Sequence, residues 1–189
     1  MVEAGHAHDT APGGGIAPLV ARLPIPAEWR CIVAVPDRPP AISGAEEDAA
    51  LRALPDPSDD AVARVAHLVH EVLVRATTAG DLRTFGRALT EIQRINGEWF
   101  APVQGGTFAA GPSEHLVRVM TKWGAHGVGQ SSWGPAVYGI VEGVDASVAL
   151  AAHVAAELGS QGTVYEGSFR DSGARVWRTT DDETGEVHR

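Results

Sequence analysis

The chain is organised around one stretch, Gly124-Ala-His-Gly-Val-Gly-Gln-Ser-Ser-Trp-Gly-Pro-Ala-Val-Tyr-Gly139. It holds five glycines, two serines, a glutamine, a tryptophan and a proline in sixteen residues. Its glycines let the backbone turn tightly or approach a ligand with no Cβ in the way. Its polar side chains add hydrogen-bonding groups, and its tryptophan adds a flat apolar face with one N–H donor. The stretch is therefore typical of a site rather than of plain core.

The order of residues in this stretch predicts a β-hairpin. A first strand is expected from about Gly127 to Ser131, a turn from Ser132 to Pro135 and a second strand from Ala136 to Val141. Two explanations of the glycines stay open: packing within the hairpin, or a pocket wall that contacts an anionic or hydroxylated ligand. The stretch is neither a G-x-x-x-x-G-K-S/T phosphate loop, because no lysine follows, nor a Rossmann fingerprint, because it does not open a helix after a strand.

A central strand and five helices are predicted around the hairpin. The strand runs from Arg30 to Val35, where a short apolar run without alternation indicates either burial on both faces or a central position in the sheet. Apolar residues at three- and four-residue steps predict the helices. They run from the capping box Ser43-Gly-Ala-Glu46 to about Leu54, from Ser58 to about Thr77, from Asp81 to Asn96-Gly97, from Pro112 to Gly124 and from Asp145 to Leu158. A last strand is predicted from Thr163 to Phe169.

This order of elements predicts an α+β fold. The expected domain has two layers, with a mostly antiparallel four-stranded sheet and helices on one face. Its final strand–strand–helix–strand portion is ferredoxin-like. Residues 1–18 are expected to be irregular, because glycine and proline recur there. Residues 19–178 are expected to form the domain, with an edge strand at 174–178, and residues 179–189 an acidic disordered tail.

The composition is that of a soluble globular chain, with 44% hydrophobic and 21% charged residues. A net charge of −9, with scattered lysines and arginines, argues against nucleic acid as a partner. The N-terminus lacks the apolar segment of a signal peptide, and no apolar stretch is long enough to span a bilayer. We therefore expect a cytoplasmic protein with no membrane partner.

The histidines and the cysteine predict neither a metal site nor a nucleophile. His67 and His70 are three apart on a helix, and His6 and His8 lie near the N-terminus. Neither pair has a third ligand at a recognisable spacing. Cys31 lies in an apolar run and is expected to be a buried thiol, and as the single cysteine it excludes an internal disulfide.

A second candidate region follows the third predicted helix. Residues 98–111 are expected to form a loop that is both aromatic and glycine-rich, with a turn at Gln104-Gly105-Gly106. Arg94, Asn96 and Glu98 crowd the end of the helix beside it. They form either a solvated face or a part of the same pocket as the turn.

Several motifs resemble the beta-ribofuranosylaminobenzene 5'-phosphate synthase family, which belongs to the GHMP kinase superfamily. The resemblance lies in Phe85-Gly86, Glu91-Ile-Gln-Arg-Ile-Asn-Gly-Glu-Trp-Phe100, Gln104-Gly-Gly-Thr-Phe108 and above all Gly127-Val-Gly-Gln-Ser-Ser-Trp-Gly-Pro-Ala-Val-Tyr-Gly139. Val2-Glu-Ala-Gly-His6 and the segment from Ala17 to Trp29 resemble the part of the family just after the middle. The resemblance extends from about residue 2 to about residue 170.

Members of this family condense phosphoribosyl pyrophosphate with 4-aminobenzoate or 4-hydroxybenzoate and release carbon dioxide and pyrophosphate, in methanopterin-type cofactor synthesis. The resemblance implies that the glycine-rich stretch holds phosphate or pyrophosphate and that the aromatic region flanks the aromatic acid. It implies Mg²⁺ as a cofactor, and Glu98 is a candidate for negative charge beside the ribose. The implied substrate-binding residues are Gly127, Gly129, Gln130, Ser131, Ser132, Trp133, Gly134, Gln104, Gly105, Gly106, Arg94, Asn96 and Glu98.

The chain departs from the family in lacking a match to the N-terminal GHMP domain and its P-x-x-x-G-L-x-S-S-like loop. It resembles the C-terminal domain and the connector before it, and the charged residues of the chemistry are expected in the other half. An N-terminal GHMP domain or subunit is thus an implied partner, and the catalytic residues stay unknown. The alternatives are a non-catalytic module that binds a small molecule and the C-terminal half of an ATP-dependent small-molecule kinase, against which Ser131-Ser-Trp133 argues. For assembly, a homodimer is an open alternative.

Overall fold

The computed structural model describes residues 2–3, 19–39, 42, 44–173 and 176. The elements follow the order β1 (Val2–Glu3), β2 (Leu19–Ala21), β3 (Trp29–Pro36), α1 (Ala45–Ala53), α2 (Asp59–His67), η1 (Leu68–Leu73), α3 (Val74–Ala79), α4 (Leu82–Gln104), α5 (Ser113–Lys122), β4 (Gly127–Gln130), β5 (Val137–Glu142), α6 (Val144–Leu158) and β6 (Gly162–Ser168). The predicted edge strand at 174–178 lies outside the described residues except for Val176, which is in no strand. The predicted acidic tail also lies outside them.

Four strands form one antiparallel sheet in the order β4–β5–β3–β6. The prediction of a central first strand is confirmed, because β3 pairs with β5 on one side and with β6 on the other. The short strands β1 and β2 pair antiparallel in a separate sheet. The expectation of an irregular N-terminal segment is therefore wrong for Val2–Glu3, since the pairing partner lies too far along the chain to leave a local signal. The remainder of that segment lies outside the described residues.

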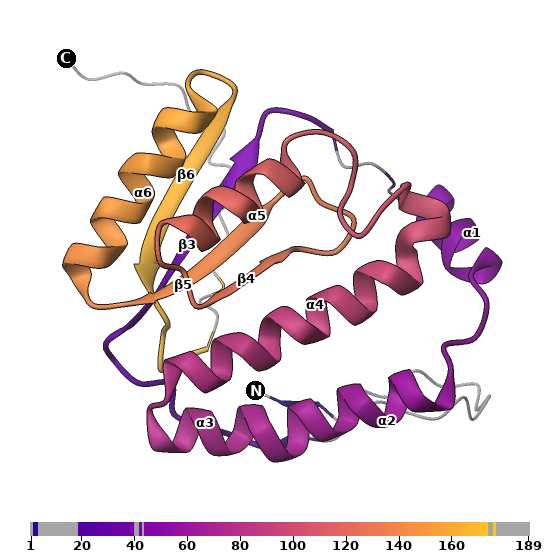
Figure 1. The fold of residues 1–189 in the computed structure, drawn as a ribbon, viewed down its shortest axis with the longest axis horizontal. Coiled ribbons are helices and arrows are strands. Elements are labelled where there is room, and N and C mark those ends of the chain that lie inside the picture. Colours follow the sequence, from indigo (N-terminus) through magenta and orange to yellow (C-terminus); the bar gives the residue numbers. More distant parts are fainter. Residues whose placement is uncertain (1, 4–18, 40–41, 43, 174–175, 177–189) are drawn as a thin grey trace, which may run out of the picture.

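Helices α5 and α6 lie against one face of the sheet (Figure 1). The main core forms between them and the sheet, and its fully buried members are Ile32, Ala34, Leu116, Met120, Val137, Leu150 and Val154. Helix α4 packs along β4, where Leu82, Phe85 and Leu89 of the helix surround Trp29 and Ile140 of the sheet. The continuous rod of α2, η1 and α3 then packs on α4. The predicted α+β class with a four-stranded antiparallel sheet is confirmed. The helices lie on both faces rather than on one as expected, since α4 contacts Trp29 and Ile140, whose side chains point away from the core beneath α5 and α6.

The other face of β3 and β6 is partly open. Cys31, Val33 and Val35 are half-buried there, and Tyr165 of β6, which pairs with Val33, is 59% exposed. Cys31 is thus less buried than the sequence predicted, although burial still raises the pKa of its thiol. This face offers apolar surface for a further layer.

Local signals place most helix starts correctly. The side chain of Ser58 accepts a hydrogen bond from the backbone N–H of Ala61 at 3.3 Å, and Asp81 accepts one from Thr84 at 2.9 Å, as predicted for capping residues. The predicted capping box at Ser43 is wrong: Gly44 is the N-cap of α1, without a side-chain cap hydrogen bond, and Ser43 itself lies outside the described residues. The predicted Asp145 cap is wrong: Gly143 is the N-cap of α6 and Asp145 lies in the first helical turn.

Helix α4 is longer than the sequence predicted. Asn96-Gly97 does not end it, and the expected loop at 98–111 is helical as far as Gln104. Gly97 instead allows a close contact, because a Cβ there would lie 2.3 Å from the carbonyl oxygen of Thr107. The helix ends at Gly105, whose φ of 86° is a left-handed conformation that glycine adopts without strain.

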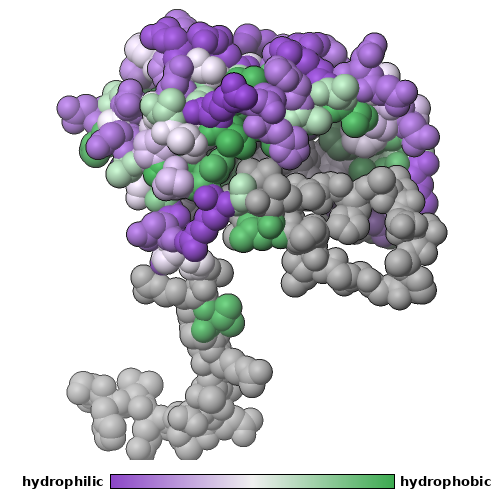
Figure 2. Space-filling view, turned by 90° about the horizontal axis from the view of Figure 1, so that it is seen from below, coloured by the Kyte–Doolittle hydropathy of each residue, from purple (hydrophilic) through white to green (hydrophobic). Residues whose placement is uncertain are grey.

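The hairpin is confirmed, with β4 and β5 in antiparallel register and a turn over residues 131–136. Gly134–Pro135 is a cis peptide bond, and Ser132 has a φ of 49°. Figure 2 shows one face of the molecule, on which hydrophobic side chains form small groups among hydrophilic ones. Within the described ranges, no helix has the length and apolar character needed to cross a membrane.

Candidate functional site

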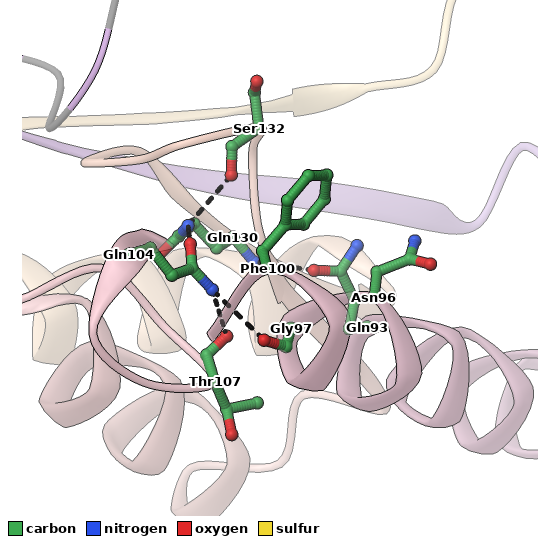
Figure 3. A pocket seen from close by; sticks show the side chains of 8 residues that line it. All are labelled: Gln93, Asn96, Gly97, Phe100, Gln104, Thr107, Gln130 and Ser132. Carbon is green, nitrogen blue, oxygen red and sulfur yellow. Dashed lines mark hydrogen bonds between the residues drawn. The ribbon is translucent and has the colours of Figure 1, made fainter. Parts of the chain in front are cut away.

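A small cavity of about 110 Å³ lies where the C-terminal half of α4 meets the β4–β5 turn (Figure 3). Helix α4 and the loop after it supply most of its wall, and the end of β4 and the turn supply the rest. The lining residues are Gln93, Asn96, Gly97, Phe100, Gln104, Thr107, Gln130 and Ser132. The structure therefore brings together the two regions that the sequence singled out, the glycine-rich stretch and the segment around Gln104.

Gln130 is the central brace of this site. It is buried, and its Oε1 accepts the backbone N–H of Ala109 at 2.7 Å. Its Nε2 donates to the carbonyl oxygen of Ser132 at 2.9 Å and to Oε1 of Gln104 at 3.3 Å. Its own backbone N–H donates to Oε1 of Gln93 on α4 at 3.1 Å. One side chain thus fixes the turn, the loop and the end of the helix relative to one another.

Gln104 completes the brace at the end of α4. Its Nε2 donates to the carbonyl oxygens of Gly106 and Thr107 at 2.8 and 3.0 Å. These bonds shape the loop that begins at Gly105. The side chains of Gln104 and Gln130 make their hydrogen bonds to other protein groups. They therefore stabilise the walls of the cavity and leave no free group for a ligand.

Four side-chain polar groups of the lining remain for a ligand. They are the side-chain amide of Asn96, Nε2 of Gln93, Oγ of Ser132 and Oγ1 of Thr107, none of which bonds to another side chain or backbone group in the described part of the chain. Figure 3 shows Gln93 and Asn96 side by side on α4 and Ser132 across the cavity beyond Phe100. All side chains that line the cavity are uncharged, so the site suits a neutral or singly charged polar group next to a ring.

The glycines of β4 face α4 rather than the cavity. A Cβ on Gly129 would lie 2.5 Å from the side chain of Gln93 and 2.6 Å from Oη of Tyr138. A Cβ on Gly127 would lie 3.1 Å from Leu89. The space beside these two glycines is therefore filled by helix and strand side chains, and their role here is the close approach of α4 to β4.

Burial gives Tyr138 unusual acid–base behaviour beside this contact. Burial raises the pKa of Tyr138 to about 12, with a smaller contribution from the nearby Cys31 thiol. The phenol therefore stays protonated at pH values at which an ordinary tyrosine ionises.

Arg94 and Glu98 do not reach the cavity. They form an ion pair with each other at 2.6 Å on the neighbouring face of α4 and line a separate hollow of about 410 Å³ with Trp99. The helical period explains the split, since positions 93, 96, 97, 100 and 104 share one side of α4 while 94 and 98 share another. Only Asn96 of the three helix-end candidates lines the cavity.

The remaining sequence candidates surround the cavity without lining it. Ser131 closes the turn by donating its N–H to the carbonyl of Ala136 at 2.9 Å. Gly106 accepts from Gln104, and Gly105 ends α4. Gly134 has a φ of 72° and lies against Gln130.

An aromatic wall borders the cavity. Phe100 lines it, and Trp133 lies behind with ring centroids 4.6 Å apart and the two planes at 61°. The indole N–H of Trp133 donates to the carboxylate of Glu47 on α1 at 3.0 Å. The sequence did not predict Phe100 and Gln93 as site residues. In a helix that continued past Gly97, they would lie four and three positions from Asn96 and hence on the same side.

The site does not fit a metal ion held by this chain alone. Its lining side chains include no carboxylate, the ligand that Mg²⁺ prefers in proteins. Among the described residues no group of three histidine, cysteine, aspartate or glutamate side chains is placed to hold a metal.

Solved structures identify the class of fold. The chain superimposes on a homoserine kinase from Cytophaga hutchinsonii with a TM-score of 0.57 and 18% identity, over 78% of this chain and 44% of that one. It matches a mevalonate pyrophosphate decarboxylase from Streptococcus pyogenes with a TM-score of 0.58 and 11% identity, over 82% of this chain and 48% of that one. These enzymes are of the GHMP kinase superfamily, and the chain has the fold of its C-terminal domains.

Relatives found by sequence indicate which proteins of this fold class the chain is similar to. A beta-ribofuranosylphenol 5'-phosphate synthase from Methanothermobacter thermautotrophicus is 30% identical over 92% of this chain and 53% of that protein. A protein of the same name from Archaeoglobus fulgidus is 30% identical over 67% of this chain and 37% of that protein. No family model matches the chain. The resemblance seen in the motifs is confirmed: the chain is related to these synthases and spans about half the length of the first.

Proposed function

We propose that this chain is the C-terminal domain of a synthase that joins phosphoribosyl pyrophosphate to 4-hydroxybenzoate or 4-aminobenzoate, as a step of methanopterin-type cofactor synthesis in the cytoplasm. The observation that carries the proposal is the convergence of two sequence motifs on one cavity with an aromatic wall. In this proposal the bond from ribose C1 to pyrophosphate breaks, and pyrophosphate leaves with the electron pair. The ring carbon that carries the carboxylate bonds to C1. The bond between that carbon and the carboxylate then breaks, carbon dioxide leaves, and the electron pair of the broken bond returns to the ring.

The cavity suits the aromatic acid better than the phosphorylated sugar. Phe100 offers a ring surface, and Asn96, Gln93 and Ser132 offer uncharged groups to a hydroxyl, amine or carboxylate. Ligand pockets commonly measure about 300–1,000 Å³, and this cavity is about 110 Å³. A phosphoribosyl group must therefore extend beyond it.

A second domain or subunit is proposed as the partner that binds the phosphorylated end. The chain spans 53% of the Methanothermobacter relative, so about half of that protein has no counterpart here. Pyrophosphate recognition needs cations, and the cavity has no charged side chain. We assign the cations, and any Mg²⁺ that accompanies pyrophosphate, to an N-terminal GHMP domain. The half-open face of β3 and β6, with Val33 and Tyr165, is apolar surface on which such a domain could pack.

The proposal is tested by mixing the chain with a separately expressed N-terminal half of the Methanothermobacter relative. Release of carbon dioxide from carboxyl-labelled 4-hydroxybenzoate, dependent on phosphoribosyl pyrophosphate, is expected in the mixture and not with either part alone. The matched control is the intact relative under the same conditions. If the intact relative turns over and the mixture does not, although the two parts form a complex, the synthase proposal fails.

A second candidate, a module that binds a small molecule without catalysis, is favoured by the chemistry of the lining. Gln104 and Gln130 bond within the protein, and no titratable side chain lines the cavity, so no general acid or base is present to activate the Ser132 or Thr107 hydroxyl. Calorimetric titration with 4-hydroxybenzoate and with phosphoribosyl pyrophosphate separates the two candidates. Binding by the chain without turnover in any complex favours the module.

A further inference from the structure

The indole of Trp133 is held by two side chains. The Phe100 ring meets it edge-on, with centroids 4.6 Å apart. Its Nε1–H also donates to Oε1 of Glu47 at 3.0 Å. Trp133 is only 4% exposed, so protein groups rather than solvent fix the orientation of the ring.

Glu47 comes from α1, a helix with little buried surface of its own. Ala50 is the single residue of α1 that is buried, and so small an apolar face gives a helix little packing against the domain. A second indole holds the segment that leaves α1, since Nε1 of Trp99 donates to the carbonyl oxygen of Pro55 at 2.7 Å. Trp133, behind the cavity wall, and Trp99, in the neighbouring hollow, therefore tie this part of the chain to the domain.

The two tryptophans belong to one aromatic row. Phe100 stands between them, 4.9 Å from Trp99 and 4.6 Å from Trp133 by ring centroids. Edge-to-face contact is a preferred geometry for aromatic rings, so a change in the Trp133 orientation is transmitted to Phe100. Phe100 is also the ring that lines the cavity (Figure 3). The bond to Glu47 thus lies one ring away from the proposed ligand.

We propose that Glu47 is a positioning residue for ligand binding. Its carboxylate holds Trp133, and through Trp133 the Phe100 ring, as the wall against which a single-ring aromatic acid packs. The identity of the ligand rests on the proposed function. Glu47 itself lies outside the cavity lining, so it acts through the two rings and not by contact with the ligand.

The test compares three variants of the full chain labelled with 5-fluorotryptophan. Glu47→Ala removes the acceptor, Glu47→Gln keeps an oxygen acceptor at the same length, and Glu46→Ala removes a neighbouring exposed carboxylate as the matched control. The Trp133 resonance, assigned with Trp133→Phe, is expected to shift or broaden in Glu47→Ala only. Because α1 is largely exposed, all three variants are expected to keep the circular dichroism of the unaltered chain.

Titration of the same proteins with 4-hydroxybenzoate supplies the functional readout. Without Glu47 the two rings must be ordered when the ligand binds, and immobilising a side chain commonly costs up to about tenfold in affinity, so Glu47→Ala is expected to bind up to about tenfold more weakly. Glu47→Gln and Glu46→Ala are expected within about twofold of the unaltered chain.

Each other outcome removes a different part of the reasoning. An unchanged Trp133 resonance in Glu47→Ala overturns the positioning role, and so does a displaced resonance with unchanged affinity, because the bond is then structural only. No binding by the unaltered chain overturns the aromatic-acid ligand of the proposed function and the ligand role of Glu47 with it. Equal binding by the chain and all variants overturns the inference about Glu47 alone.

Discussion

Replacing Gly86 by alanine is expected to destabilise the fold, although alanine is the better helix former. Gly86 lies in α4, and a Cβ built on it would lie 2.0 Å from the carbonyl oxygen of His126. The same Cβ would lie 2.8 Å from the backbone nitrogen of Gly127. Both neighbours are backbone atoms, so no side-chain rotation relieves the contact. The helix must therefore move away from β4.

The required movement sets the magnitude. Ordinary Cβ contacts begin at 3.4 Å, so a contact at 2.0 Å requires a separation of about 1.4 Å (3.4 − 2.0). A gap of this size forfeits much of the dispersion energy between α4 and β4, and overpacking typically costs about 1–3 kcal/mol. Helix propensity alone would favour alanine by about 1 kcal/mol. Because both clashing neighbours are backbone atoms, the steric cost lies at the upper end of this range, about 3 kcal/mol, and we expect a net loss of about 2 kcal/mol in the free energy of unfolding.

Urea unfolding followed by far-ultraviolet circular dichroism measures this loss. The matched control is Gly167→Ala in β6, where a new Cβ has no heavy atom within 4 Å. The control is expected within about 0.5 kcal/mol of the unaltered chain. If Gly86→Ala unfolds at the same or a higher urea concentration than the unaltered chain, helix propensity dominates. The close approach of α4 to β4 would then be refuted.

Three further predictions concern individual side chains. Gln130→Ala leaves buried backbone groups without partners and is expected to lower the free energy of unfolding by about 2–4 kcal/mol in the same urea assay, whereas a surface glutamine would cost almost nothing. The hydrogen bond from Arg30 holds the pKa of the Glu166 carboxyl below its ordinary 4.5, with a further contribution from Ser147. The stabilisation from this ionised carboxylate is present above pH 4.5 and is lost as the pH falls through the lower pKa of the folded state. The urea midpoint should therefore fall less steeply on acidification in Glu166→Gln than in the unaltered chain. With a pKa of about 12, Tyr138 is expected to stay protonated at pH 10, so Tyr138→Phe should remove almost none of the tyrosinate absorbance at that pH.

Local chemistry explains what could be predicted from the sequence. Ser58 and Asp81 act as caps through hydrogen bonds to residues three positions along, so each signal and its partner lie in the same short segment. The hairpin was predictable for the same reason. Its two strands are joined by a turn of glycine, serine and proline, which is a local pattern.

Contacts between distant segments explain what could not be predicted. Gly97 looks like a helix end in the sequence, but its requirement for glycine is set by Thr107, on a loop that returns against the helix. Because α4 was predicted to end at Gly97, Glu98 and Phe100 were assigned to a loop. The helical period that places Arg94 and Asn96 on different sides of α4 could then not be used. Glu47 gave no signal at all, because its partner Trp133 lies 86 positions away.

The structure also redistributes the roles that the resemblance implied for the glycine-rich stretch. Phosphate-binding glycines present free backbone to a ligand, but the space beside Gly127 and Gly129 is occupied by Leu89 and Gln93 of α4. A multiply charged pyrophosphate would also be costly to desolvate in a cavity whose lining is uncharged. Arg94, the one cation among the predicted site residues, is paired with Glu98 on another face of α4. In the proposed synthase the hairpin therefore builds the aromatic-acid side of the site, and the charges that bind pyrophosphate come from the second domain. The proposal therefore predicts that the aromatic acid binds this chain alone, whereas phosphoribosyl pyrophosphate binds only to the complex with the second domain.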